Sequence, residues 1–218
     1  MKHAPHYTTL QKFASRIPSA LLDRIIKSFL PEEHAPSASL IIGVDASGFK
    51  PSKASSYYTQ SFKPRKKKRY VKCTLAVELK AQLVCSFKAR RIARHDVVDF
   101  MPVLEKASLP SGVTVVADKA YDAETCHVYV RERLNGYTVI PPRHEGLPVW
   151  KTKGRYRKQM RRGYPEAVYH QRSKDETVFS VVKRVMTEHL ASRMVRTQNR
   201  ELAFRLIAYN AYRLINKT

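Results

Sequence analysis

The stretch LIIGVDASGF, residues 40–49, sets the architecture of this 218-residue chain. Its first five residues, Leu40–Val44, form a short continuous apolar run, which is typical of a strand buried on both faces, and Asp45 follows directly. Val113–Ala117 repeats the pattern and is followed by Asp118. In open α/β sheets, chemistry gathers at the carboxyl ends of such strands. The two aspartates therefore converge if these two strands are neighbours, which spacing alone does not decide.

The segments around these strands predict a mixed α/β domain. Ala46–Gly48 is expected to turn the chain, and the alternating runs Tyr70–Leu79 and Gln82–Lys88 predict an antiparallel hairpin. The remaining patterns predict a weak strand at Ser55–Gln60, helices at 96–107, 122–135, 174–190 and 197–215, and a short strand at 137–140, with Gly136 as a helix C-cap. The expected order is three strands, helix, strand, helix, strand, basic insertion and two helices.

Two regions stand apart from this core. Residues 1–36 predict a helical appendage and linker, since residues 18–30 place apolar side chains on one helical face and a proline-bounded segment follows. Residues 37–218 then form the main domain. Within that domain, residues 143–172 are predicted to be a basic insertion around Trp150, the chain's one tryptophan. Trp150 shows no usable periodicity, and it fits a satellite core or a DNA contact equally well.

Charge is the first functional indication. The chain has 41 Lys and Arg against 18 Asp and Glu, a formal net charge of +23. A surplus of this size attracts nucleic acid, the commonest intracellular polyanion. The cations cluster in two groups that we expect to contact DNA phosphates: Lys66, Lys67, Lys68 and Arg69, and Arg157, Lys158, Arg161 and Arg162. For the first group, a role in solubility alone is the alternative.

The sequence argues against several other classes of protein. No run of about 18 apolar residues is present, and the N-terminus lacks the apolar segment of a signal peptide. Three cysteines without CxxC spacing argue against a disulfide framework or a zinc knuckle. We therefore expect a protein of a reducing intracellular compartment, cytoplasmic and nucleoid-associated, with no membrane partner.

A polar stripe near the C-terminus is formed by four residues at nearly helical spacing: Tyr169, Arg172, Glu176 and Lys183. All four share one face if the helix begins near the tyrosine. If it begins at Ser173 or Lys174, only the glutamate and the lysine are certain to share it. The stripe presents one acid flanked by cations, which suits an anionic substrate beside a metal. Asp175 is an alternative third acid, about 100° further around the helix.

Together these motifs resemble the DDE transposases of bacterial and archaeal insertion sequences. The stripe matches the Tyr-x(2)-Arg-x(3)-Glu-x(6)-Lys signature of one group of that family at every position. GVDASGF (43–49) and ADKAYDA (117–123) resemble its first and second acid motifs, and Arg94-His95-Asp96, Ile140–Arg143 and Tyr209-Asn210 are also similar to family motifs. The resemblance covers about residues 39–215.

The resemblance implies a ribonuclease H-like mixed sheet flanked by helices and a metal-dependent enzyme. It implies that Asp45, Asp118 and Glu176 are catalytic and bind Mg²⁺, with Mn²⁺ as a substitute, during cleavage of transposon ends and transfer of the 3′-hydroxyl into target DNA. Mg²⁺ prefers hard oxygen ligands, and two such ions can stabilise both the attacking and the leaving oxygen. On the helix, we expect DNA contacts from Tyr169, Arg172 and Lys183. The active complex is expected to be a homodimer.

Each assignment has a plainer alternative. Asp45 and Asp118 fit ordinary turn formers, Glu176 fits a surface acid in a helical ion pair, and His95 and Asp96 fit a cap for the following helix. For the whole chain, the alternatives are a domesticated DNA-binding protein that no longer cleaves and another ribonuclease H-like nuclease. The intact acids argue against the first, and the signature spacing argues against the second. Few residues precede the first strand, so we expect a short version of the family, an N-terminally truncated fragment, or a catalytic subunit that another component completes.

Overall fold

The computed structural model describes residues 5–30, 40–51, 70–92, 94–144 and 146–216. Its α-helices and β-strands, in chain order, are α1 Tyr7–Arg16, α2 Ser19–Lys27, β1 Ile41–Pro51, β2 Val71–Glu78, β3 Leu83–Arg90, α4 Val97–Ala107, β4 Thr114–Ala117, α5 Glu124–Val128, β5 Tyr137–Val139, α6 Arg155–Arg162, α7 Glu166–Tyr169, α8 Ser173–Met186, β6 His189–Leu190 and α9 Val195–Ile215. The weak strand expected at Ser55–Gln60 and the cations Lys66–Arg69 lie outside the described residues.

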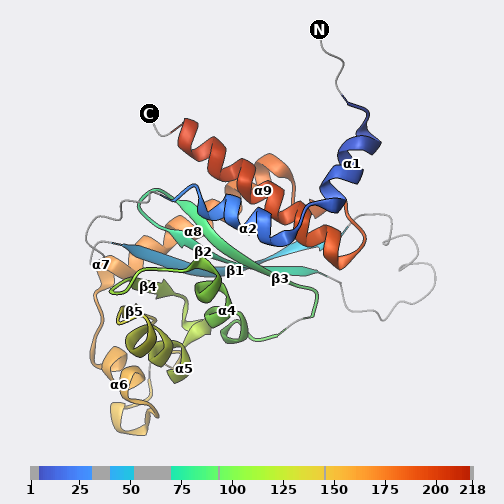
Figure 1. Cartoon of the computed structure of the whole chain (residues 1–218). Helices are drawn as coiled ribbons and strands as arrows, with labels where there is room; N and C mark the ends of the chain where they lie inside the picture. Colours follow the sequence, from blue (N-terminus) through green and yellow to red (C-terminus); the bar gives the residue numbers. More distant parts are fainter. Residues whose placement is uncertain (1–4, 31–39, 52–69, 93, 145, 217–218) are drawn as a thin grey trace, which may run out of the picture.

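The core is a mixed sheet with strand order β3-β2-β1-β4-β5, and β6 pairs beside β1 (Figure 1). The hairpin prediction is confirmed, because β1, β2 and β3 are antiparallel neighbours. By contrast, β1, β4 and β5 run parallel to one another. Val44 pairs with Ala117 at the end of the β1–β4 register, so Asp45 and Asp118 each follow the last paired position. The structure thus supplies the neighbouring strands that the sequence left open.

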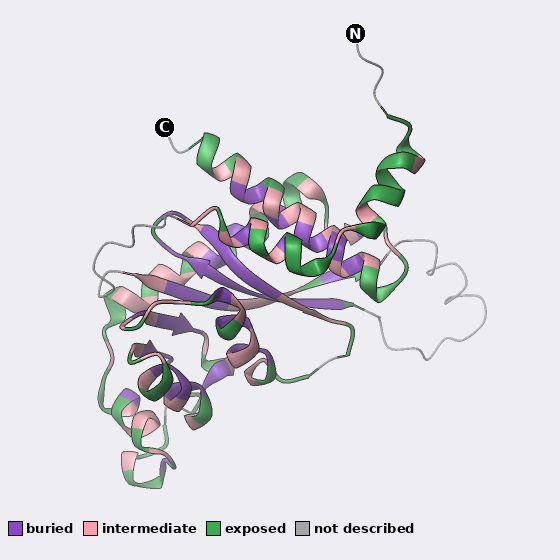
Figure 2. Ribbon diagram, viewed as in Figure 1, coloured by how far each residue is buried: buried purple, intermediate pink, exposed green. Residues whose placement is uncertain are grey.

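Helices cover both faces of the sheet, and the strands between them are buried (Figure 2). On one face, α2 and α9 pack against β3 and α8 packs against β1, and Leu22 and Ile26 bring α2 into that core. On the other face, α4 and α5 contribute buried side chains such as Phe100 and Cys126. α1 buries none of its residues. The mixed sheet with helices on both faces confirms the α/β class expected from the sequence.

Two local predictions need correction. β1 does not turn at Ala46–Gly48 but continues to Pro51, because β2 goes on pairing with it as far as Phe49. At the end of the helical segment after Asp118, the left-handed residue is Asn135, with φ of 47°, rather than Gly136. Gly136 is needed for space instead, since a Cβ there would lie 2.2 Å from the carbonyl oxygen of Val113.

The outer edge of β3 is closed by the last helix. Asn210 accepts a hydrogen bond from the Val84 amide and donates one to the Val84 carbonyl, both at 2.9 Å. The Tyr209 hydroxyl donates to the Gln82 carbonyl at 3.0 Å. An unpaired strand edge invites association with other chains, so this Tyr-Asn pair has a structural role in covering the edge.

Candidate active site

The candidate site lies where α8 runs along β1. The Asp175 carboxylate fills the space beside Gly43, where a Cβ would stand 1.9 Å from Oδ2, and Lys183 Nζ donates to Ser47 Oγ at 2.6 Å. Four strand residues and eight helix residues both span about 12–13 Å, so helix and strand run side by side in the same direction. Side chains alternate along a strand, which places Asp45 on this same face, between the two contacts.

Asp45 lies among other carboxylates. Burial is the main cause that raises the pKa of Asp45, and the negative charges of Glu176 and Asp118 raise it further, against the Ala46 amide and Arg172. On the neighbouring strand, Asp118 accepts a hydrogen bond from the Lys119 amide at 2.6 Å. Glu176 and Asp118 are therefore each close enough to Asp45 for their charges to repel its carboxylate, and a cation beside Asp45 would relieve that repulsion.

Glu176 is held by the arginine of the same stripe. Arg172 Nη2 donates to Glu176 Oε1 at 2.7 Å, and the guanidinium lies 5.9 Å from the centre of the Tyr169 ring. Tyr169 ends α7, and a 3₁₀ turn leads directly into α8. The helical segment therefore begins near the tyrosine, which is the condition that the sequence set for the stripe. Lys183 lies apart from the other three, on Ser47. The Glu176 side chain is 57% exposed, and an ion pair this exposed stabilises the fold only modestly.

The alternative acid, Asp175, points the other way. It is 1% exposed, and neither carboxylate oxygen has a hydrogen-bond partner in the described structure. Burial first, then repulsion from Asp45, raises the pKa of Asp175 to about 8. The residue lies against the sheet rather than at the surface that DNA can reach, so the geometry favours Glu176 over Asp175 as the third acid.

The donor set suits a hard cation, but the three acids are not yet gathered around one point. Within the described ranges, no group of three His, Cys, Asp or Glu side chains is arranged to hold a metal ion. Asp45, Asp118 and Glu176 offer only carboxylate oxygens, which Mg²⁺ prefers. Glu176 is exposed and held by one ion pair, so its side chain is not fixed in this position by packing.

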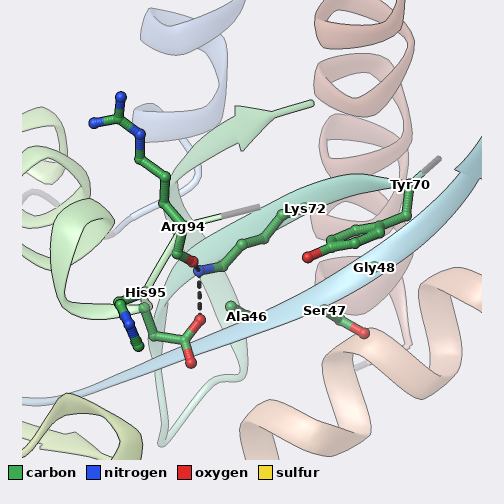
Figure 3. Close-up of a pocket in the computed structure, with 8 residues that line it drawn as sticks. Ala46, Ser47, Gly48, Tyr70, Lys72, Arg94 and His95 are labelled. Atoms are coloured by element: carbon green, nitrogen blue, oxygen red, sulfur yellow. Dashed lines mark hydrogen bonds and ion pairs between the residues drawn. The ribbon is translucent and has the colours of Figure 1, made fainter. Parts of the chain in front are cut away.

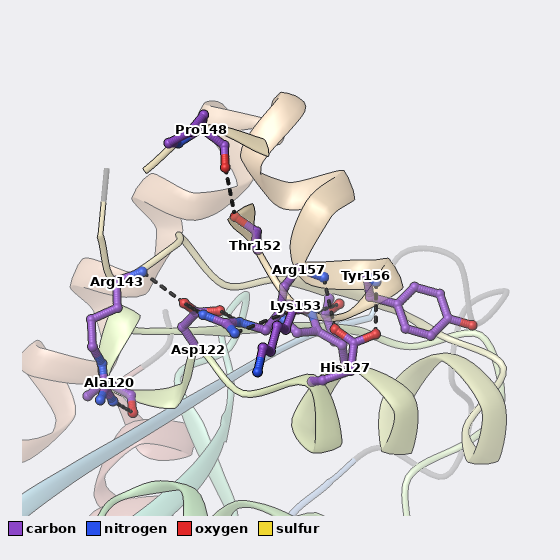
Figure 4. A network of polar contacts seen from close by, with 11 residues as sticks. Ala120, Asp122, His127, Arg143, Pro148, Thr152, Lys153, Tyr156 and Arg157 are labelled. Atoms are coloured by element: carbon purple, nitrogen blue, oxygen red, sulfur yellow. Dashed lines mark hydrogen bonds and ion pairs between the residues drawn. The ribbon is translucent and has the colours of Figure 1, made fainter. Parts of the chain in front are cut away.

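The loop after Asp118 is fastened to the basic insertion by a buried ion pair (Figure 4). Arg157 of α6 donates from Nε and Nη2 to the two oxygens of Asp122, at 2.6 and 2.7 Å. The Arg143 amide donates to the same carboxylate at 2.9 Å. Burial alone would raise the pKa of Asp122, but these donors outweigh it and lower that pKa. The expectation that Arg157 contacts DNA is therefore corrected: its guanidinium docks α6 onto the Asp118 loop.

Glu124 completes the docking of α6. Its carboxylate accepts hydrogen bonds from the Tyr156 and Arg157 amides at 3.0 and 3.1 Å, at the start of the helix (Figure 4). An acid at this point satisfies amides that have no partner within the helix and matches the helix dipole. The basic helix itself was missed in the sequence, because its cations dominate the pattern and only Met160 is buried.

The remaining candidate residues are distributed around this site. Trp150 is 74% exposed, which excludes a place in the core, and Lys151 Nζ lies 5.0 Å from its ring centre. Asp96 starts α4 but makes no side-chain cap, because its carboxylate pairs with Lys72 instead. The other expected cations of α6, Lys158, Arg161 and Arg162, are half-buried or exposed. All three cysteines of the chain are buried and free.

The comparisons agree with this architecture. No helix among the described residues is long and apolar enough to cross a membrane. A search of curated proteins found no match. A family model described as the transposase DDE domain matches residues 36–211, a segment that contains the mixed sheet and all three candidate acids. The chain therefore belongs to the transposase DDE-domain family, with the ribonuclease H-like fold that the sequence motifs implied.

Proposed function

We propose that this chain cleaves DNA strands at insertion-sequence ends and transfers the resulting 3′-hydroxyl into target DNA. The observation that carries the proposal is the register that sets Asp45 and Asp118 on neighbouring parallel strands, beside the helix that bears Glu176. Membership of the family supports a transposase-type function. The steps of cleavage and joining are our inference from the carboxylate set.

In this proposal Asp45, Asp118 and Glu176 hold Mg²⁺, with Mn²⁺ as a substitute. When bound, the metal supplies charge stabilisation at the phosphorus and favours ionisation of the attacking hydroxyl. The chain's own residues position the DNA. Lys183 sits at Ser47, two residues after Asp45 and on the same face of the strand, where its ammonium can contact a phosphate next to the cut. Arg172, once Glu176 turns away, has a guanidinium available for a second phosphate.

The DNA surface extends from this centre over basic residues. We propose contacts from Tyr169 and from Lys158, Arg161 and Arg162, with the cationic run Lys66–Arg69 contributing on grounds of sequence alone. Two transposon ends must be processed together, so we propose a homodimer as the active complex. A place on the nucleoid in the cytoplasm follows from the DNA partner.

The test combines nicking of supercoiled plasmid with joining of labelled 3′-hydroxyl DNA ends, in Mg²⁺ or Mn²⁺. The wild type should nick and join, and Asp45→Asn, Asp118→Asn and Glu176→Gln should lose both activities while still binding DNA. Asp175→Asn is the matched control, because it removes a neighbouring carboxyl that lies outside the set, and it should remain active. Wild-type rates in Asp118→Asn, or loss of activity in Asp175→Asn alone, would refute the assignment.

A non-cleaving DNA-binding protein on the same fold is the second candidate. The observation that favours it is the pairing of Glu176 with Arg172, which leaves the third acid away from the other two. This candidate predicts that the wild type binds DNA without producing any nick in either metal. The same plasmid assay therefore separates the two functions.

A further inference from the structure

A small hollow of about 150 Å³ opens at the edge of the sheet, where α2, α4 and α9 meet β3. α2 lies alongside α9 on this side of the sheet (Figure 1). Phe87, which lines the hollow, pairs with Leu75, and Leu75 pairs with Asp45. The hollow therefore lies two strands away from the carboxylates, with the buried Leu75 in between. Neither the carboxylate set nor the proposed DNA contacts use it.

A buried arginine lines this hollow. Arg200 of α9 is only 4% exposed, and its Nε donates to the Ile17 carbonyl at 2.9 Å. No described residue forms a hydrogen bond or an ion pair with its two terminal nitrogens. A guanidinium carries five N–H donors and a permanent charge, and a buried charge without a partner of opposite sign is costly. The fold thus leaves Arg200 with unused donors and an uncompensated charge.

Lys72 is the other buried lysine or arginine in the described ranges, and the fold treats it differently. Its ammonium pairs with the Asp96 carboxylate and also donates to the Arg94 carbonyl at 3.0 Å (Figure 3). Arg200 has a neutral carbonyl where Lys72 has a carboxylate. The contrast indicates that an anion which the described chain does not supply completes the surroundings of Arg200.

The charges around the hollow favour such an anion. Among the described residues, Lys88, Lys106 and Arg200 line it, against one acid, Asp23. That acid is already neutralised, because Asp23 Oδ1 accepts from Lys106 Nζ at 2.7 Å. The Lys106 ammonium also donates to the Phe87 carbonyl at 3.1 Å. The positive charge that remains without a partner at the hollow includes that of the buried guanidinium.

Two neutral donors lie beside the arginine. Ser19 and Asn199 both line the hollow, and Ser19 is the first residue of α2, where backbone amides have no partner within the helix. Sites for drug-sized molecules commonly measure about 300–1,000 Å³, so this smaller hollow suits one compact group. A compact anion with several acceptor oxygens matches a guanidinium, a hydroxyl and an amide.

We propose that this hollow binds a single phosphoryl group, whose oxygens accept hydrogen bonds from the Arg200 guanidinium, the Ser19 hydroxyl and the Asn199 side-chain amide. A guanidinium can bind two phosphate oxygens at once. Inorganic phosphate and a backbone phosphate of DNA present the same oxygens, so both are sources of the ligand. The site goes beyond the proposed function, because it requires neither a metal nor cleavage.

The test is a calorimetric titration of inorganic phosphate into the whole chain, in EDTA and at an ionic strength held constant with chloride. The wild type should bind phosphate saturably, one ion per chain. Arg200→Leu should weaken this binding by about 10- to 150-fold, since a hydrogen bond to a charged group contributes about 1.5–3 kcal/mol and each 1.4 kcal/mol is a factor of ten. Arg196→Leu is the matched control, because it removes an exposed cation one turn earlier on α9, and it should keep the wild-type affinity.

A second variant keeps the test decisive if Arg200→Leu does not fold. Ser19 is exposed, and an acid in the first turn of a helix is favourable, so Ser19→Glu should fold. Its carboxylate should repel phosphate and abolish the binding. A wild type that does not bind phosphate, or a folded Arg200→Leu or Ser19→Glu variant with wild-type affinity, would overturn the proposal.

Duplex DNA distinguishes the two sources of the phosphoryl group. If a DNA phosphate fills the hollow, saturating DNA should abolish the binding of inorganic phosphate, and Arg200→Leu should lower the salt slope of DNA binding by about 0.9. If the ligand is a free ion, inorganic phosphate should bind the DNA complex with unchanged affinity, and the slope should stay the same. Neither measurement involves metal or cleavage, so failure of the proposed function leaves both results valid.

Discussion

Asp175 offers the sharpest test of the structure, because its buried carboxyl has no hydrogen-bond partner among the described residues, and only the charge of Arg172 acts against its burial. It lies in the first turn of α8, is 1% exposed, and has no hydrogen-bond partner for either oxygen among the described residues. Burial, with repulsion from Asp45, raises its pKa from 3.8 to about 8. We predict that Asp175→Asn, which keeps the shape and removes the ionisation, stabilises the protein at neutral pH.

The magnitude follows from the change in pKa on folding. Between pH 3.8 and about pH 8, the unfolded chain loses the proton of Asp175 while the folded chain keeps it. The free energy of unfolding therefore falls as the pH rises through this range. At pH 7 the unfolded carboxyl is about 3 pH units above its pKa, which costs the wild type about 4 kcal/mol of unfolding free energy. The variant should recover much of this cost, and its advantage should grow from pH 5 to pH 8.

The assay is urea unfolding followed by circular dichroism at pH 5, 6, 7 and 8, in EDTA so that no metal acts on the adjacent Glu176. Taking the difference between wild type and variant at each pH cancels the titration of all other groups. Asp175→Leu is a second variant, since its branched side chain resembles a carboxyl in outline and needs no hydrogen bond. If the wild type and Asp175→Asn have the same urea midpoint and the same pH dependence of stability, the carboxyl is solvated or paired in the wild type. That result would refute the reasoning.

Three further predictions concern the site and its surroundings. Mg²⁺ should raise the melting temperature of the wild type, because it relieves carboxylate repulsion, and an equal rise in Asp118→Asn measured by differential scanning fluorimetry would contradict the proposed ligand set. Neutralising residues 66–68 to alanine should weaken binding to all DNA sequences alike and reduce the salt slope by up to about 0.9 per lost phosphate contact; an unchanged slope in binding titrations would remove this segment from the interface. Arg157→Leu should lower the unfolding free energy by about 3 kcal/mol at pH 7, since it leaves Asp122 buried without its partner. Because the folded pKa of Asp122 is lowered, the pair stabilises above its ordinary value of 3.8 and the deficit should shrink as pH falls below about 4; urea unfolding that finds no deficit at pH 7 would mean that the pair contributes nothing.

The sequence by itself determined the elements whose patterns are local. The apolar runs before Asp45 and Asp118, the alternation of the β2–β3 hairpin and the periodicity of the long helices are each carried by neighbours along the chain, and each was predicted close to its observed place. The spacing of the stripe is also a local pattern, because residues four apart on a helix are neighbours. The Arg172–Glu176 ion pair could therefore be predicted from the sequence. Local patterns did not predict α6, whose fold depends on contacts with Asp122 and Glu124 from elsewhere in the chain.

Only the tertiary structure decided which residues meet across the fold. The parallel register of β1 and β4 brings Asp45 beside Asp118, and no spacing along the chain encodes that pairing. β1 extends past its acid because β2 continues to pair with it, an effect of a partner strand that overrides the turn signal at 46–48. Tertiary packing also decides which way each charged side chain points: Arg157 pairs with the buried Asp122, and Asp175 is buried against the sheet while Glu176 is exposed to solvent. Composition indicates how much charge a chain carries, but its partners depend on three-dimensional packing, because burial and distance set the energy of each pair.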